Sequence, residues 1–303
     1  MGIPVILDTD IGTDVDDVWA LVVLLRSPEL DVKLITTSTG DTVYRAKLVA
    51  KALEVAGRED IPIGIGIPLD DLALTHDEWL GAYDLKNYSG TVLRDGVGAI
   101  CESIMASTEK VSLVCIGPVP NIAAALAREP EIVNNARFIG MHGSLRRGYL
   151  DAPKPMREYN VKQHALSCRA AFEASWEKII TPLDTCGTVV LEGDRLQKVL
   201  RAAEQDPITA IAVDNHLAWF RAIDWPAYRD VNPLVQSSVL FDTVAIYLAI
   251  STDFLKMESL PVVVTPDGKT MIDEAGGQVA CAMDWLDKES FLDWVVDRLM
   301  GAA

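Results

Sequence analysis

The chain has 303 residues, of which half are hydrophobic and 23% are charged, as in an ordinary globular protein. Its formal net charge of −17 would repel phosphate backbones and anionic lipid headgroups, which argues against a nucleic-acid or membrane-surface partner. A metal ion or a neutral small molecule suits this charge better.

The five cysteines are scattered along the chain and form no Cys-x-x-Cys pair, so neither a disulfide framework nor a zinc site is predicted. No apolar run reaches the length that spans a bilayer, and Met1–Leu7 lacks the basic region of an export signal. We therefore expect reduced thiols and a cytoplasmic protein.

Short apolar runs alternate with helix-period stretches along the first part of the chain. The apolar runs are typical of strands buried on both faces, and they lie at residues 4–7, 32–37, 61–64, 111–115, 137–141 and 178–183. Helical periodicity lies between them at residues 18–26, 46–56, 121–127 and 165–174. This alternation predicts an α/β fold with a mostly parallel, open, Rossmann-like sheet and helices on both faces.

Two segments lack clear periodicity, residues 75–98 and 144–159, and we expect them to form long loops that wall a pocket. The last third predicts helices at 208–220, 243–250 and 288–300, and a strand at 260–265. Because no repeat or linker interrupts this pattern, we expect one domain that spans residues 1–303.

An acidic segment follows the first predicted strand and contains Asp8, Asp10, Asp14, Asp16 and Asp17. Carboxylates this close repel one another and are tolerated when a hard cation lies among them. The competing interpretation is a solvated turn that caps the next helix, because aspartates are favourable in a first helical turn.

Two other metal-binding families share part of this pattern. An EF-hand loop beginning at Asp8 would need glycine and glutamate where Thr13 and Trp19 stand, so that interpretation fails. A haloacid-dehalogenase-type phosphatase, with Asp8 as nucleophile, Asp10 as acid/base and Mg²⁺ as metal, stays open as an alternative.

The whole set of polar stretches resembles the inosine-uridine-preferring nucleoside hydrolases, whose opening motif is DxDxGxDDxxA. Asp8–Gly12 and Asp16–Ala20 match its two halves, separated by two extra residues. Further stretches resemble the family in the same order, at residues 36–41, 117–123, 158–160 and 240–245. The resemblance implies calcium-dependent hydrolysis of the N-glycosidic bond of ribonucleosides by a homo-oligomer, a dimer or tetramer.

The resemblance also implies roles for individual residues. Asp10, Asp17, Asp242 and the carbonyl of Pro120 would bind Ca²⁺, and Asp16 would be the general base. The residues that would bind the substrate are Asp41, Glu158, Asn160 and His142.

The chain departs from the family on the side of the leaving base, where Phe241 stands in place of a histidine. Leaving-group assistance then falls to His142, to Arg146, or to stacking on an aromatic ring, for which Trp79, Trp219, Trp225 and Tyr149 are the candidates. A non-catalytic ribose- or nucleoside-binding protein is the alternative that this departure leaves open.

Overall fold

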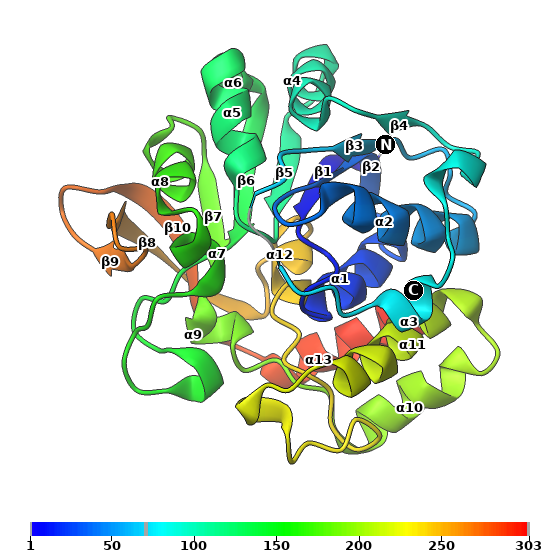
Figure 1. Ribbon diagram of the computed structural model, residues 1–303. Coiled ribbons are helices and arrows are strands. Elements are labelled where there is room, and N and C mark those ends of the chain that lie inside the picture. Colours follow the sequence, from blue (N-terminus) through cyan, green and yellow to red (C-terminus); the bar gives the residue numbers. More distant parts are fainter. Residues whose placement is uncertain (1, 70–71, 302–303) are drawn as a thin grey trace.

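The computed structural model describes residues 2–69 and 72–301, and its strands form one ten-stranded sheet (Figure 1). The strand order is β4-β3-β2-β1-β5-β6-β7-β10-β8-β9. The bounds are β1 Ile3–Thr9, β2 Leu30–Thr37, β3 Ile63–Ile65, β4 Val92–Leu93, β5 Val111–Cys115, β6 Ala136–Met141, β7 Lys178–Thr181, β8 Leu255–Val264, β9 Thr270–Ile272 and β10 Gly277–Trp285. All pairings are parallel except those of β8 with β10 and β9, which confirms the predicted mostly parallel sheet.

Helices cover both faces of this sheet, as Figure 1 shows. One layer contains α1 Asp16–Leu25, α2 Thr42–Ala56, α10 Gly193–Ala203, α11 Pro207–Ala222, α12 Thr243–Leu248 and α13 Lys288–Leu299. The other contains α4 Gly96–Ala106, α5 Pro120–Arg128 and α8 Ala165–Glu173. Shorter helices are α3 Asp77–Leu80, α6 Ile132–Asn135, α7 Tyr159–Gln163, α9 Leu183–Cys186, η1 Leu85–Asn87, η2 Tyr149–Asp151 and η3 Pro226–Tyr228. Among the described residues, no helix has both the length and the apolar character needed to cross a membrane.

The two layers explain why the central strands lack a polar alternation. Leu7 and Ile139 face the layer of α1, whereas their neighbours Ile6 and Phe138 face the layer of α4, and all four are fully buried. A strand covered on both faces needs apolar side chains at every position. This is why β1, β2, β5 and β6 could be predicted from the sequence within about two residues.

The sequence did not predict the longer elements α4, α10 and β10, nor β9 and the other short elements β4, α3, α6, α7, α9 and η1–η3. β10 lies beside β7 and pairs antiparallel with β8, so the C-terminal part of the chain completes the sheet. Its residues 277–285 are buried on only part of their length, which weakens the apolar signal that marks the central strands.

Candidate functional site

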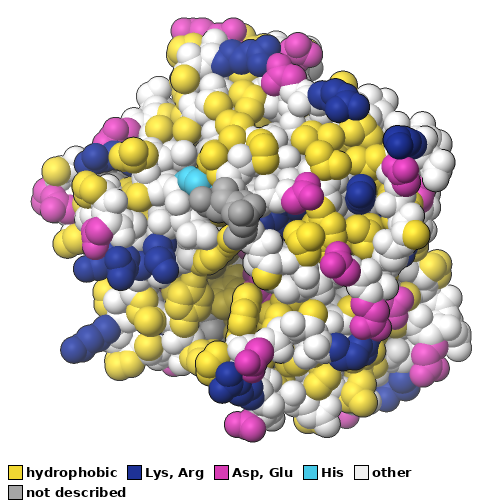
Figure 2. Space-filling view, viewed as in Figure 1, with side chains coloured by type: hydrophobic (Ala, Val, Ile, Leu, Met, Phe, Trp, Pro, Cys, Tyr) yellow, Lys and Arg dark blue, Asp and Glu magenta, His cyan; other side chains and the backbone are white. Residues whose placement is uncertain are grey.

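A cavity opens at the carboxyl ends of β1, β5 and β6, the edge where parallel sheets place their binding residues. Figure 2 shows the molecule hollowed below the centre of the view, with mainly hydrophobic side chains around the hollow. Acidic and aromatic side chains share the lining of the cavity, which consists of Asp10, Thr13, Asp14, Asp16, Asp17, Ile116, Met141, Tyr149, Glu158, Tyr159, Asn160, Trp225, Phe241 and Asp242.

Three buried carboxylates form the centre of this lining. Oxygen atoms of Asp16 and Asp17, at the first turn of α1, and of Asp242, just before α12, all lie within 4.8 Å of one another. The hydroxyl of Thr9 donates a hydrogen bond to the carboxylate of Asp17. Two segments more than 200 residues apart therefore meet at one acidic cluster.

Asp10 approaches the cluster from the end of β1 and is also buried. Gly117, after β5, makes room for it, because a Cβ at that position would lie 2.4 Å from Asp10 Oδ1. Any side chain at position 117 would displace this carboxylate.

Burial dominates the electrostatics of these groups. It raises the pKa of Asp10 to about 6, and it raises the pKa values of Asp16, Asp17 and Asp242 well above the usual range. Repulsion from neighbouring aspartates adds to the effect at the last three residues.

The donor set fits a hard divalent cation. All of the donors are carboxylate oxygens, and Asp242 Oδ1 is buried without a hydrogen-bond partner among the described residues. A bound cation would supply that partner and offset the repulsion between the carboxylates.

Asp8 lies outside the cavity lining and is fully buried. Its Oδ1 accepts hydrogen bonds from the Thr36 hydroxyl at 2.6 Å and from Asn121 Nδ2 at 2.7 Å. A phosphatase nucleophile must reach its substrate, so this position gives no support to the phosphatase alternative.

Glu158 and Asn160 face the cavity from the segment that enters α7. Glu158 accepts hydrogen bonds from the backbone amides of Gly143 at 3.0 Å, Asn160 at 2.6 Å and Val161 at 3.1 Å. Burial outweighs these contacts and raises the pKa of Glu158 to about 7. The side chain is therefore fixed in place by three amide contacts.

Asn160 connects the ends of two strands to the same wall of the cavity. Its Nδ2 donates to the carbonyls of Met141 at 2.9 Å and Ile116 at 3.2 Å. Its Oδ1 accepts no hydrogen bond from the rest of the described chain, so it is available to a ligand hydroxyl.

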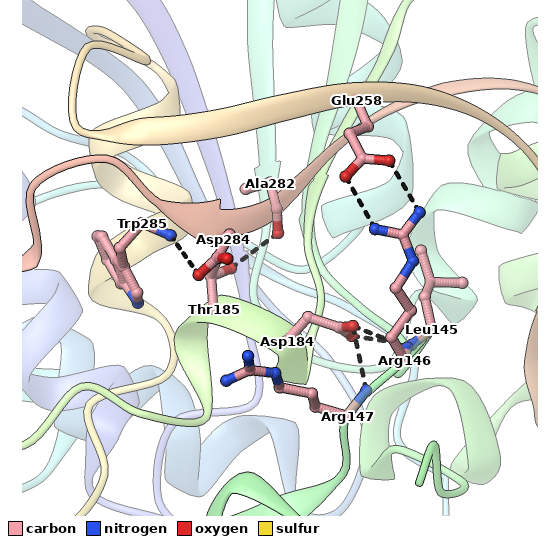
Figure 3. A network of polar contacts seen from close by, with 9 residues as sticks. All are labelled: Leu145, Arg146, Arg147, Asp184, Thr185, Glu258, Ala282, Asp284 and Trp285. Carbon is pink, nitrogen blue, oxygen red and sulfur yellow. Dashed lines mark hydrogen bonds and ion pairs between the residues drawn. The ribbon is translucent and has the colours of Figure 1, made fainter. Parts of the chain in front are cut away.

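The loop that carries Glu158 is anchored where it begins (Figure 3). The Asp184 carboxylate accepts hydrogen bonds from the backbone amides of Leu145 at 2.9 Å, Arg146 at 2.7 Å and Arg147 at 3.1 Å. The Arg146 guanidinium makes two 2.8 Å contacts with Glu258 on β8, so it is directed away from the acidic cluster rather than toward a substrate.

Three residues expected at the site do not line the cavity. Asp41 is exposed and caps α2 by accepting hydrogen bonds from the amides of Val43 and Tyr44. His142 is fully buried beside Phe138. It lies just past the end of β6, four residues after Phe138, and this spacing directs both side chains to the same face of the sheet. Pro120 begins α5 and is buried outside the lining.

Aromatic residues form another part of the cavity lining. Tyr149 and Phe241 meet edge to face with ring centroids 5.9 Å apart, and Trp225 is 39% exposed. Of the other tryptophans considered for stacking, Trp219 is fully buried. Tyr159 also lines the cavity and was not predicted, since an isolated tyrosine in a sequence carries no positional signal.

Asp8 provides a test of these electrostatics. Burial raises its pKa to about 7, whereas an aspartate in an unfolded chain titrates near 3.9. Between roughly pH 4 and 7, Asp8 is protonated in the folded state and ionised in the unfolded state. The free energy of unfolding therefore falls as the pH rises through this window, because the folded protein must then hold a buried charge.

Asp8→Asn keeps an oxygen acceptor for Thr36 and Asn121 but removes this titration. In chelator-treated protein, wild type should lose more stability than the variant between pH 5 and pH 8. The Tm difference, variant minus wild type, should therefore increase over this range, by the equivalent of about 1–3 kcal/mol. Differential scanning calorimetry measures this, and Asp253→Asn, at an exposed position, is the control. Equal pH responses of both variants would contradict the assignment.

Comparison with known proteins identifies the family. The model of the inosine-uridine preferring nucleoside hydrolase family matches residues 5–293. The non-specific ribonucleoside hydrolase RihC of Salmonella paratyphi A is 30% identical over 312 residues, which covers 97% of this chain and 96% of that protein. RihC of Klebsiella pneumoniae (strain 342) is 33% identical over 207 residues, which covers 65% and 66%.

Solved structures show the same fold at lower identity. The plant nucleoside hydrolase PpNRh1 aligns with a TM-score of 0.84 at 20% identity over 99% of both chains. The purine-preferring ribonucleoside hydrolase of Gardnerella vaginalis aligns with a TM-score of 0.79 at 22% identity over 98% of both. The chain therefore belongs to the inosine-uridine preferring nucleoside hydrolase family and is an enzyme that hydrolyses the N-glycosidic bond of ribonucleosides.

Proposed function

We propose that this nucleoside hydrolase uses one calcium ion, held by Asp10, Asp17 and Asp242. The expected fourth ligand, the backbone carbonyl of Pro120, rests on the family resemblance alone, because Pro120 lies outside the cavity lining. The observation that carries the proposal is the oxygen-only cluster at the centre of the cavity, with one buried oxygen that lacks a partner. Many oxygen ligands and no nitrogen or sulfur favour calcium over a transition metal.

When bound, calcium supplies positive charge that holds the vicinal ribose hydroxyls and lowers the pKa of water. The chain itself supplies the base, because the Asp16 carboxylate lies at the cluster and lines the cavity. Asp16 would accept the proton of the attacking water as the bond from the sugar to the base breaks.

The ribose would be oriented by the wall that contains Glu158 and Asn160. Glu158 is fixed by three backbone amides, and Asn160 presents a free Oδ1. Fixed acceptors of this kind bind sugar hydroxyls without losing side-chain entropy during the reaction.

The leaving base would lie against the aromatic wall, where Phe241 cannot donate a proton. Tyr149 and Trp225 offer flat apolar surfaces on which a base stacks. This wall determines which bases depart readily.

We also propose a cytoplasmic homo-oligomer that acts on small nucleosides. All five cysteines are free and buried, which suits a reducing compartment. The charge of −17 disfavours nucleic-acid and membrane-surface partners.

Calcium removal tests the metal assignment. Chelation should abolish hydrolysis, and calcium should restore it, whereas Asp10→Ala should lose both calcium binding and activity while it keeps the wild-type circular dichroism spectrum. Isothermal titration calorimetry measures the binding. Normal calcium affinity in Asp10→Ala would show that Asp10 is not a ligand. Recovery of activity with zinc but not with calcium would show that the metal is zinc.

The variant Asp16→Asn tests whether Asp16 acts as the general base or as a calcium ligand. We expect kcat to fall by about three orders of magnitude or more while the calcium Kd changes less than about threefold. Asp17→Asn serves as the matched control, because loss of a ligand should weaken calcium binding. Since Asp16 lies within 4.8 Å of Asp17 and Asp242, loss of calcium binding in Asp16→Asn would instead make it a ligand.

Phe241 leads to a prediction about the leaving group. A nitrophenyl riboside needs no protonation on departure, so its kcat/KM should exceed that of inosine by about 100-fold or more. Phe241→His should raise the inosine value and leave the nitrophenyl value nearly unchanged.

Comparable wild-type values for the two substrates would show that another group already assists departure. Hydrolysis of neither compound, with calcium and ribose still bound, would favour a non-catalytic binding protein.

A further inference from the structure

A buried arginine lies directly behind the acidic segment. Arg45, on α2, is 2% exposed, and its guanidinium donates to the Thr39 carbonyl at 2.8 Å, the Ile11 carbonyl at 2.7 Å and the Thr13 hydroxyl at 3.2 Å. It also donates to the backbone carbonyl of Asp10. One side chain thus connects the loops that follow two neighbouring strands, β1 and β2.

The contacts of Arg45 are unusual for a buried cation. Each acceptor is neutral, and Arg45 forms no ion pair with the described residues. Burying a charge without a paired carboxylate is costly, so the nearby carboxylates must stabilise it through space. Burial raises the pKa values of Asp10 and Asp17, with Asp10 adding to the rise at Asp17, and the charge of Arg45 opposes both.

The backbone that Arg45 holds has little regular structure of its own. Gly12 has a φ of +115° and Thr39 a φ of +59°, which is rare for a β-branched residue. Thr13 O accepts hydrogen bonds from Thr75 Oγ1 at 2.9 Å and Trp219 Nε1 at 3.1 Å. The conformation of the segment therefore depends on side chains from other elements, and among the described residues Arg45 donates the side-chain hydrogen bond to the Asp10 carbonyl.

We infer that Arg45 is a positioning residue whose hydrogen bonds to the carbonyls of Asp10 and Ile11 and to the Thr13 hydroxyl place the Asp10 carboxylate in the cation site. The inference rests on the proposed function, because Asp10 is one of the proposed calcium ligands. Two effects of removing Arg45 have opposite signs. Loss of a positive charge would strengthen cation binding, whereas release of the backbone would weaken it.

Arg45→Met and Arg45→Lys separate these effects. If positioning dominates, Arg45→Met weakens calcium binding about tenfold or more, as loss of a supporting contact to a ligand does in other metal sites. Arg45→Lys keeps the charge but lacks the planar fork that reaches several acceptors, so its calcium Kd should also rise. Titration calorimetry on the full chain measures both at a temperature where circular dichroism shows them folded.

Arg298→Met is the matched control, because Arg298 is also nearly buried and contacts Glu29 and the Arg26 carbonyl, none of which lines the cavity. It should lower Tm without changing the calcium Kd. Calcium binding by Arg45→Met that equals or exceeds that of wild type would overturn the inference. Absence of calcium binding in wild type would overturn the metal proposal instead.

A second measurement needs no metal. Hydrogen exchange in chelator should show faster exchange of the amides at residues 11–15 in Arg45→Met and Arg45→Lys, and no such change in Arg298→Met. Unchanged exchange in that segment would show that Arg45 does not hold it and would overturn the inference even if calcium does not bind.

Discussion

The repulsion between buried carboxylates at the end of β1 is the constraint on which this structure depends. Asp10, Asp16, Asp17 and Asp242 are each no more than 5% exposed, and they meet where the sheet, α1 and α12 converge. Burial pushes the pKa values of all four upward, and repulsion between the carboxylates adds to the rise at Asp16, Asp17 and Asp242. The fold supplies the rigidity that brings these groups together, since folding free energy must offset their mutual repulsion.

Hydrogen bonds and one positive charge around the cluster offset part of the repulsion between the carboxylates. Thr9 donates to Asp17, and Asn121 and Thr36 donate to Asp8 one layer deeper. Arg45 adds a positive charge on the side opposite the cavity. Among the described residues, Asp242 Oδ1 in the cavity lining is left without a hydrogen-bond partner, as is Asp8 Oδ2 outside the lining.

How much could be predicted from the sequence depends on the burial of each segment. β1, β2, β5 and β6 are covered on both faces, so their apolar runs predicted them, whereas β10 is only partly buried and gave no such run. Family motifs predicted six residues that line the cavity: Asp10, Asp16, Asp17, Glu158, Asn160 and Asp242. They could not predict that Asp41 would cap α2, or that His142 would project to the same face of the sheet as Phe138, because both depend on local backbone geometry.

The segment between Gly143 and Glu158 is fixed by hydrogen bonds at its two ends, whereas its tip is exposed. Asp184 binds three consecutive amides where the segment begins, and Glu158 binds the Gly143 amide where it closes. Leu150, at the tip, is 65% exposed and adopts a positive φ. Insertions or deletions at such an exposed tip leave the contacts at both ends in place. Homologues can therefore differ in loop length here without moving the carboxylate of Glu158, so the reach of the loop over the ligand can vary independently of sugar recognition.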